Sequence, residues 1–499
     1  MNDFKIRYRI VSALLMFLML AGCGHVDGQS AASSAAAPRG STSPVPAPTV
    51  TGPIEGGLHG VPWGGAVPAL APLAAHDFVQ EEYFYSGTAQ ARDENGALTG
   101  AEADYNTRML VQRPRDPAAF NGTVVLEWVN VSLEAELPVI WLLTHDELLR
   151  EGYAWVGVSA QITGVSVSPL ALKVWDPLRY APLHHPGDAY EFDIYAQAAR
   201  ALFARNGPAP LGPLQARRVM AAGESQSAAL LRTYVNHVDA EQRVVDGVLI
   251  HTWPGPIDAD ARIPVLMLLT ESEIDGASSP LGSLRAVSWA GMIGGLDLGD
   301  LPGAGPLRVP IAEQPSPDHR HLRVWEVAGA SHGDQDLVEA FIAQLSQDLL
   351  EPLAPPLTLD LPPGSLPINN LKLARVTSAA LHQLDRWMRT GTPPPSMPRV
   401  QRRDSGYIDR DEDGFARGGI RLPNYAVPIG LNRGDTLPLV GSYAAFAPAQ
   451  IRARYPSRDA FLDTFADATA ASVDAGALLE PDAQAFLDEA QAVDAWRAP

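Results

Sequence analysis

The sequence predicts an α/β protein built on a doubly wound, mostly parallel sheet, with insertions and a C-terminal extension. Three observations point to this class. Short apolar runs alternate with amphipathic helical runs along much of the chain, which is the pattern of repeated strand–helix–strand units. The runs at 123–129 and 154–158 are almost wholly apolar, as strands buried on both faces of a parallel sheet are. The run at 218–222, which is apolar from Val219 onward, leads through a tight turn of small and polar residues into another helical run.

Strands are expected where β-branched, aromatic and other apolar residues cluster between turn signals. They are predicted at 81–87, 105–111, 123–129, 154–158, 218–222, 244–250, 265–269 and 322–327. Helices are predicted at 138–150, from 188 onward, directly after residue 225, and at 370–390. The last of these is strongly amphipathic, and Gly391 marks its end.

Composition and charge limit the function classes. The chain of 499 residues is 46% hydrophobic and 19% charged, and its formal net charge is −20. So acidic a chain argues against nucleic acid as a partner, because phosphate binding requires clustered Lys and Arg. The sequence holds neither a P-loop nor a G-x-G-x-x-G run. We therefore expect no nucleic-acid partner and no cofactor.

The N-terminus is typical of a secreted protein. Basic residues precede an apolar run at 10–20, which is short for a bilayer-spanning helix and is interpreted as part of a signal peptide over 1–23. Leu-Ala-Gly-Cys at 20–23 resembles a bacterial lipoprotein box. The resemblance implies that Cys23, the single cysteine of the chain, is acylated. An ordinary signal peptide with a chance cysteine is the alternative.

This resemblance also predicts a location. Several acyl chains on one cysteine give stable membrane anchoring. The residue after Cys23 is Gly24 rather than Asp, which by the lipoprotein sorting rule favours the outer membrane. We expect a protein of the cell envelope that is lipid-anchored through Cys23 and faces the periplasm or the cell surface. The sequence does not determine the oligomeric state.

The mature chain is expected to have three parts. Residues 24–52 are rich in Ala, Ser and Pro and are predicted to form a disordered tether. Residues 53–400 are predicted to form the catalytic domain, and residues 401–499 a C-terminal extension packed on its core. Within the domain, the segments 162–187 and 274–317 are expected to wall a substrate pocket.

The turn after the strand at 218–222 carries the first chemical signal. Its sequence, Gly-Glu-Ser-Gln-Ser at 223–227, is a G-x-S-x-S version of the nucleophile elbow of α/β-hydrolases. Such a turn lifts the serine hydroxyl off the sheet edge, and the next backbone N–H points at the oxyanion that develops during catalysis. We therefore predict Ser225 as the nucleophile and the N–H of Gln226 as an oxyanion donor.

A serine nucleophile needs a histidine base, which in this fold follows the last strand. The strand at 322–327 is followed by a loop of small residues and then by His332. Other histidines are less suitable: His237 and His382 lie within predicted helices, and His319 and His321 precede the strand. His332 is therefore the predicted base.

The acid that orients the histidine is expected just past the strand at 265–269. Glu273 is the favoured candidate, and Glu271 is the alternative acid. Asp258 and Asp260, which follow the preceding strand, remain as further candidates.

A second oxyanion donor is expected from the backbone after the strand at 123–129, where Asn130 or Val131 lies; Asn130 is the first choice. The run 409–414 begins like a calcium loop, but Ile420 occupies its twelfth position, where an EF-hand needs Glu. The pair His184 and His185 has no evident partner ligands. We expect no metal site.

Several stretches together resemble a known family. They lie at 82–89, 121–132, 152–161, 185–190, 223–228 (Gly-Glu-Ser-Gln-Ser-Ala) and 418–423. The combination is similar to a bacterial α/β-hydrolase-domain family of esterase-like proteins. The resemblance implies the α/β-hydrolase fold, with Ser225 as nucleophile and His332 as base. In such a family the acid is commonly Asp, so Glu273 departs from the pattern.

The favoured function is that of a carboxylic-ester hydrolase acting on a small-molecule ester through an acyl-enzyme on Ser225. Two alternatives stay open. The first is a non-catalytic envelope binding or scaffold lipoprotein on the same fold. The second is an acyltransferase or amidase that shares the acyl-enzyme.

Overall fold

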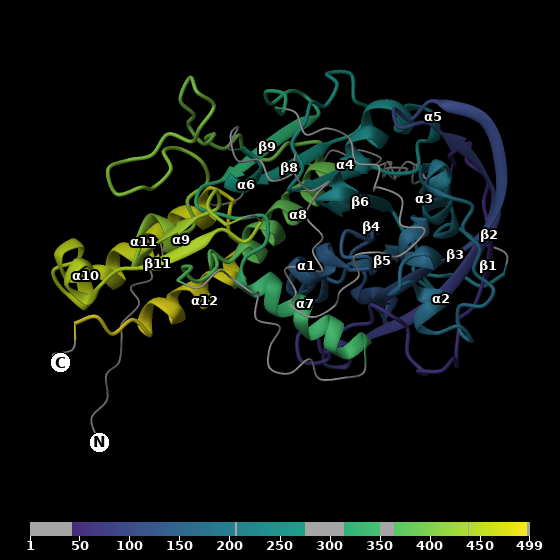
Figure 1. The fold of residues 1–499 in the computed structure, drawn as a ribbon, viewed down its shortest axis with the longest axis horizontal. Coiled ribbons are helices and arrows are strands. Elements are labelled where there is room, and N and C mark those ends of the chain that lie inside the picture. Colours follow the sequence, from purple (N-terminus) through teal and green to yellow (C-terminus); the bar gives the residue numbers. More distant parts are fainter. Residues whose placement is uncertain (1–41, 205–206, 275–313, 350–363, 438, 497–499) are drawn as a thin grey trace, which may run out of the picture. The chain divides into compact units, whose positions relative to one another are not determined.

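The computed structural model describes residues 42–204, 207–274, 314–349, 364–437 and 439–496 (Figure 1). The predicted signal peptide, Cys23 and residues 24–41 of the predicted tether lie outside the described residues, as does most of the predicted pocket wall at 274–317. No helix in the described ranges combines the length and apolar character that crossing a bilayer requires.

Nine of the described strands form one sheet, in the order β1-β2-β3-β5-β4-β6-β7-β8-β9. Their bounds are Thr49–Thr51 (β1), Phe78–Arg92 (β2), Leu98–Pro114 (β3), Thr123–Trp128 (β4), Ala154–Val158 (β5), Arg218–Glu224 (β6), Gly247–His251 (β7), Val265–Thr270 (β8) and Leu322–Val327 (β9). All neighbours from β5 across to β9 pair in parallel. The order and the parallel pairing confirm the predicted fold class.

The predicted strands are all present, and the differences lie at their ends. β5 has the predicted start and end, as does β9. By contrast, β2 and β3 form a much longer antiparallel hairpin than predicted. The first part of β3, residues 98–102, is exposed. An exposed strand needs no apolar residues, so its sequence gives little strand signal.

The predicted tether is wrong at its C-terminal end. β1 lies within it and pairs antiparallel with residues 84–86 of β2, and Val45 is buried. β1 consists of Thr-Val-Thr, three β-branched residues that suit a pleated edge strand. The Ala- and Pro-rich composition around so short a strand gives no strand signal. Because β1 pairs with β2 and Val45 is buried, the folded part begins before residue 53.

The helices fill the connections between strands and most of the C-terminal part. Their bounds are Val139–Arg150 (α1), Leu172–Trp175 (α2), Glu191–Ala201 (α3), Gln226–Thr233 (α4), Asp239–Gln242 (α5), Glu271–Ile274 (α6), Gln335–Asp348 (α7), Leu373–Thr390 (α8), Pro423–Ala426 (α9), Pro448–Arg454 (α10), Arg458–Asp474 (α11) and Glu480–Gln491 (α12). Short 3-10 helices lie at Leu73–His76, Pro117–Ala119 and Asp188–Tyr190, and π-helical turns lie at Thr163–Val167 and Tyr234–Val238. The four predicted helices are confirmed.

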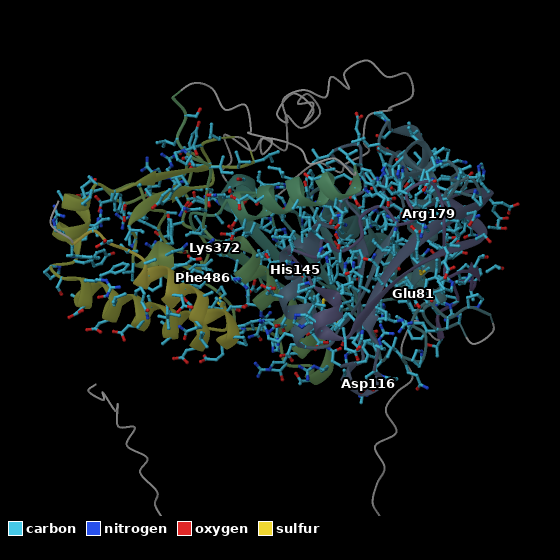
Figure 2. All side chains as sticks on the ribbon, turned by 90° about the horizontal axis from the view of Figure 1, so that it is seen from below. Glu81, Asp116, His145, Arg179, Lys372 and Phe486 are labelled. Carbon is cyan, nitrogen blue, oxygen red and sulfur yellow. The ribbon has the colours of Figure 1, made fainter. Side chains whose placement is uncertain are left out.

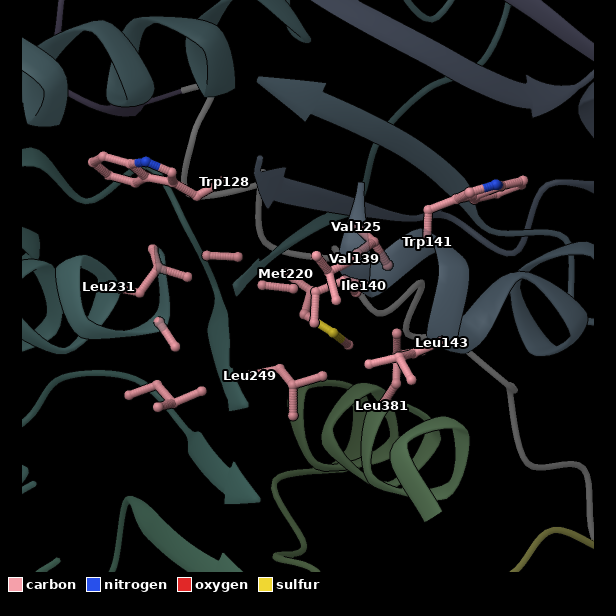
Figure 3. Close-up of a cluster of buried hydrophobic side chains, with 14 of the residues drawn as sticks. Val125, Trp128, Val139, Ile140, Trp141, Leu143, Met220, Leu231, Leu249 and Leu381 are labelled. Carbon is pink, nitrogen blue, oxygen red and sulfur yellow. The ribbon is translucent and has the colours of Figure 1, made fainter. Parts of the chain in front are cut away.

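Helices cover both faces of the parallel part of the sheet. On one face α4 packs so closely that a Cβ on Gly223 would come within 3.0 Å of Leu231. On the other face α8 packs on β7, where a Cβ on Gly247 would come within 2.5 Å of Met388. Figure 3 shows the buried side chains of this core, including Leu231 of α4 and Leu381 of α8. Because helices cover both faces of the sheet, we expect polar functional residues at the ends of its strands.

The C-terminal residues extend the sheet at its β9 edge. Ile420 donates its N–H to Glu326 at 2.7 Å and accepts from the N–H of Ala328 at 2.9 Å, which adds a parallel bridge beside β9. Gly430–Arg433 (β10) and Ser442–Ala445 (β11) form a separate antiparallel pair. Lys372 pairs with Glu489 of α12 at 3.5 Å. Figure 2 labels Lys372 and also Phe486, which lies in α12.

Candidate active site

Ser225 lies in a tight turn between β6 and α4. β6 ends at Glu224 and α4 begins at Gln226, so Ser225 alone joins strand to helix. Its φ of 56° and ψ of −120° are rare for a residue other than glycine and cost on the order of 1–3 kcal/mol. Its N–H donates to the carbonyl of His251 at 2.9 Å, which fixes the turn at the C-terminal edge of the parallel strands. The predicted strand–turn–helix is therefore present.

The serine at position 227 closes this turn. Its hydroxyl accepts from the N–H of Glu224 at 3.0 Å and donates to the Glu224 carbonyl at 2.9 Å. Gly223 stands opposite, and a Cβ there would lie 3.0 Å from both Leu231 and the backbone carbon of Ser227. Serine therefore fits at 227, where its hydroxyl both donates and accepts a hydrogen bond, whereas the close packing at 223 favours glycine.

His332 lies in the loop that follows β9, and the predicted acid Glu273 lies in α6 directly after β8. Nδ1 of His332 is 2.7 Å from Oε1 of Glu273, and both side chains are buried. The N–H of Thr270 and its hydroxyl donate to Oε2 of the same carboxylate at 2.8 and 2.7 Å. The structure therefore brings His332 and Glu273 together, with the carboxylate held by Thr270.

The alternative acid Glu271 has other partners. It pairs with Arg410 at 2.8 Å and accepts from the N–H groups of Gly329 at 2.7 Å and Gly434 at 3.0 Å. Burial raises the pKa of Glu271, and the charge of Arg410 opposes that rise. The Glu271 carboxylate therefore ties the C-terminal extension to the loop after β9.

The remaining acid candidates are not paired with the histidine in the described residues. Asp258 and Asp260 are exposed, and neither forms an ion pair with His332 in the described part of the chain. Of the four carboxylates predicted as candidates, Glu273 is the one that contacts the imidazole.

A carboxylate that was not predicted also contacts His332. Oε1 of Glu224 lies 3.0 Å from Nε2, and no hydrogen bond joins the Ser225 hydroxyl to His332 among the described residues. Burial alone would lower the pKa of His332, but the charges and hydrogen bonds of Glu224 and Glu273 outweigh it and raise that pKa to about 10. The signal that could have found Glu224 is a charged residue that follows the uncharged run at 219–223, at the end of the strand.

One predicted oxyanion donor is wrong. The backbone N–H of Asn130 donates to the carbonyl of Leu137 at 3.2 Å and so is not free for a substrate. The bridge forms because the chain doubles back after β4, which the sequence pattern does not reveal. The side chain of Asn130 serves a different contact, since Nδ2 donates to Oε2 of Glu224 at 3.1 Å.

The other two candidate donors keep free N–H groups. Gln226 is the first residue of α4, so its N–H has no acceptor within the helix. The side-chain amide of Gln226 donates to Gln161 at 2.9 Å, which holds this residue against the end of β5. The N–H of Val131 has no acceptor among the described residues. Gln226 and Val131 therefore remain the candidate oxyanion donors, and Asn130 does not.

The acidic run at 409–414 is held by its own turn. Oδ1 of Asp411 accepts from the N–H groups of Asp413 and Phe415, and Asp409 pairs with Arg403 at 3.2 Å. Across the described residues, no group of three or more His, Cys, Asp or Glu side chains is arranged to hold a metal ion.

Solved structures similar to this chain include esterases and a serine hydrolase. The alpha/beta serine hydrolase XC6422 from Xanthomonas campestris shares 16% identity over 38% of this chain and 72% of its own, with a TM-score of 0.22. A cold-adapted esterase from an Arctic intertidal metagenomic library shares 14% identity over 51% of this chain and 86% of its own (TM-score 0.23). Esterase Est22 shares 11% identity over 41% of this chain and 66% of its own (TM-score 0.25).

Sequence comparison gives the family. No curated protein matches the chain. A family model described as an alpha/beta hydrolase domain matches residues 50–288 and 305–488, and the order and direction of the sheet strands fit that description. The chain therefore belongs to the alpha/beta hydrolase domain family.

Proposed function

We propose that this protein is a serine hydrolase that cleaves carboxylic esters through an acyl-enzyme on Ser225. The observation that supports it is the 2.7 Å contact between Nδ1 of His332 and Glu273, at the sheet edge where Ser225 is held at a φ of 56°. All three residues follow the C-terminal ends of parallel strands, β6, β8 and β9, so they belong to one edge of the sheet.

The proposed reaction has two halves. Oγ of Ser225 attacks the acyl carbon while Nε2 of His332 takes the hydroxyl proton, and Glu273 stabilises the resulting imidazolium. The N–H groups of Gln226 and Val131 bind the oxyanion. His332 then protonates the leaving alcohol, and a water molecule, deprotonated by His332, hydrolyses the acyl-enzyme and frees Ser225.

The strained backbone of Ser225 supports a catalytic role over that of a non-catalytic envelope protein, because such strain persists mainly where function requires it. Acyl transfer and amide cleavage would pass through the same acyl-enzyme. Product analysis of a model ester with and without added alcohol separates hydrolysis from transfer, since only transfer yields a new ester.

A fluorophosphonate probe tests the nucleophile. It is expected to label the wild-type protein covalently and to leave Ser225→Ala unlabelled, because the alanine has no oxygen to attack phosphorus. The control is Ser227→Ala, which removes a second hydroxyl of the same turn. Equal labelling of the wild type and Ser225→Ala would contradict the assignment.

We also propose that Cys23 is acylated and anchors the protein in the cell envelope. The support is the Leu-Ala-Gly-Cys sequence at 20–23 after an apolar run. Cells grown with radioactive palmitate are expected to label the wild-type chain, and Cys23→Ala is expected to lose the label because no other cysteine exists. Label retained by Cys23→Ala would overturn this proposal.

A further inference from the structure

Glu224 lies where a carboxylate competes with the nucleophile for the base. Its Oε1 is 3.0 Å from Nε2 of His332, the ring nitrogen that the proposed mechanism needs for the Ser225 proton. The side chains of Glu224 and His332 are only 6% and 5% exposed. Because an ionised carboxylate can only accept hydrogen bonds, Nε2 carries a proton in this contact.

Two neighbours fix the direction of the Glu224 carboxylate. The hydroxyl of Thr252 donates to Oε1 at 3.0 Å, and Nδ2 of Asn130 donates to Oε2 at 3.1 Å. Thr252 makes its contact with a φ of 56°, which a β-branched residue adopts only where the surrounding structure enforces it. The carboxylate is therefore held toward His332 by contacts that also depend on backbone strain.

The second ring nitrogen faces a carboxylate as well, since Nδ1 lies 2.7 Å from Glu273. A carboxylate beside each nitrogen favours the imidazolium form of the ring, which has no lone pair for a serine proton. In the described part of the chain, the titratable groups that face His332 are Glu224 from β6, Glu273 from α6 and His251 from β7. Burial and the charge of His332 lower the pKa of His251 to about 3, so His251 is neutral near neutral pH and does not offset the carboxylates.

We propose that Glu224 is a positioning residue that holds the substrate-free enzyme in a resting form. Its carboxylate retains the proton on Nε2 of His332. That proton must leave to solvent before His332 can accept the proton of Ser225. The inference rests on the proposed function. The pKa of His332 is about 10 with both carboxylates in place, so this proton is lost at a pH well above neutral. The reactivity of Ser225 is therefore expected to rise with pH.

The decisive variant is Glu224→Gln, which keeps the shape of the side chain and removes its charge. The quantity to measure is the rate of fluorophosphonate labelling of Ser225 as a function of pH. In the variant we expect this rate to rise at least about one pH unit lower than in the wild type, because the imidazolium loses one of its two counter-charges. A labelling profile that rises at the same pH as the wild type would overturn the proposal.

Glu326→Gln is the matched control. Glu326 is also a buried glutamate at the end of a strand, but it pairs with Arg399 at 3.1 Å and accepts from the N–H of Val400 at 2.8 Å. This variant is expected to label with the wild-type pH profile. If it moved the profile as far as Glu224→Gln, a general disturbance of the site would account for both, and the proposal would fail.

A second measurement is made on the wild-type protein and does not depend on the Glu224→Gln variant. NMR shifts of isotope-labelled imidazole nitrogens report whether each ring nitrogen of His332 carries a proton, and the spectrum of His332→Gln identifies the signals. Both nitrogens are expected to be protonated at about pH 8, where an unperturbed histidine is neutral; a neutral ring would overturn the proposal. If Ser225 takes no label at any pH, the proposed function fails, and the imidazole signals still decide the role of Glu224.

Discussion

Glu273→Gln is expected to lower kcat/KM for an aryl ester by about 10⁴-fold, because it leaves the imidazole in the wrong tautomer. The two donors of Thr270, its N–H and its hydroxyl, hold Oε2 of Glu273 at 2.8 and 2.7 Å. In the variant they will select the amide oxygen, so the amide NH₂ will face Nδ1 of His332. Nδ1 then becomes an acceptor, and the ring proton moves to Nε2, where it blocks transfer from Ser225.

The control for this variant is Glu271→Gln. Glu271 is buried in the same short helix, but its carboxylate contacts Arg410 and two backbone N–H groups rather than His332. It is expected to lower the melting temperature and to keep kcat/KM within about tenfold of the wild type, because Arg410 retains its pair with Asp435 at 2.8 Å. Equal losses of kcat/KM in the two variants, measured by steady-state kinetics, would show that Glu273 is not the acid.

Arg108→Met is expected to have the largest effect on stability, a loss of about 3–5 kcal/mol in the free energy of unfolding. The guanidinium lies 2.7 Å from Glu82 and 2.7 Å from Glu136, and its side chain is 3% exposed. Methionine fills much of the volume but leaves Glu136 buried without its partner. Glu82 keeps its ion pair with Arg179 at 2.6 Å, so most of the stability loss comes from the unpaired Glu136.

Urea denaturation monitored by tryptophan fluorescence measures this loss, and Arg115→Met is the control. Arg115 pairs with Asp77 at 3.1 Å, but both side chains are about two-thirds exposed, at 66% and 67%. An exposed pair of this kind contributes about 0–1 kcal/mol, so the control is expected to unfold close to the wild-type midpoint. A change below about 1 kcal/mol for Arg108→Met would mean that the buried carboxylates find other partners or become protonated.

The strand pattern was predictable because burial dictates composition. β4, β5, β7 and β8 are buried along their whole length, and each is a run of apolar residues with few exceptions. The helix α8 was equally predictable from its amphipathic sequence, although residues 376–381 in its middle are buried on every side. Where burial is partial, as in the outer half of the β2–β3 hairpin, the pattern weakens and the predicted bounds fall short.

The turn at Ser225 was predictable because it depends on adjacent residues. Steric limits at Gly223 and the step from strand to helix are local, so a five-residue pattern is enough to locate them. His332 and Glu273 were reached through strand order, which places each residue at the end of its own strand. The choice between Glu273 and Glu271 needed more, because both lie in one turn of α6 and differ in the direction of their side chains.

Three features required the tertiary structure. The backbone N–H of Asn130 is occupied by Leu137, and the strand β1 exists because β2 offers it an edge. The contact of Glu224 with His332 joins residues more than a hundred positions apart. By itself the sequence determined the fold class and the residues proposed as nucleophile and base, because these follow from local burial, local sterics and the order of the strands along the chain. Which carboxylates meet the two nitrogens of His332 was decided by side-chain directions at the ends of separate strands, which no local pattern encodes.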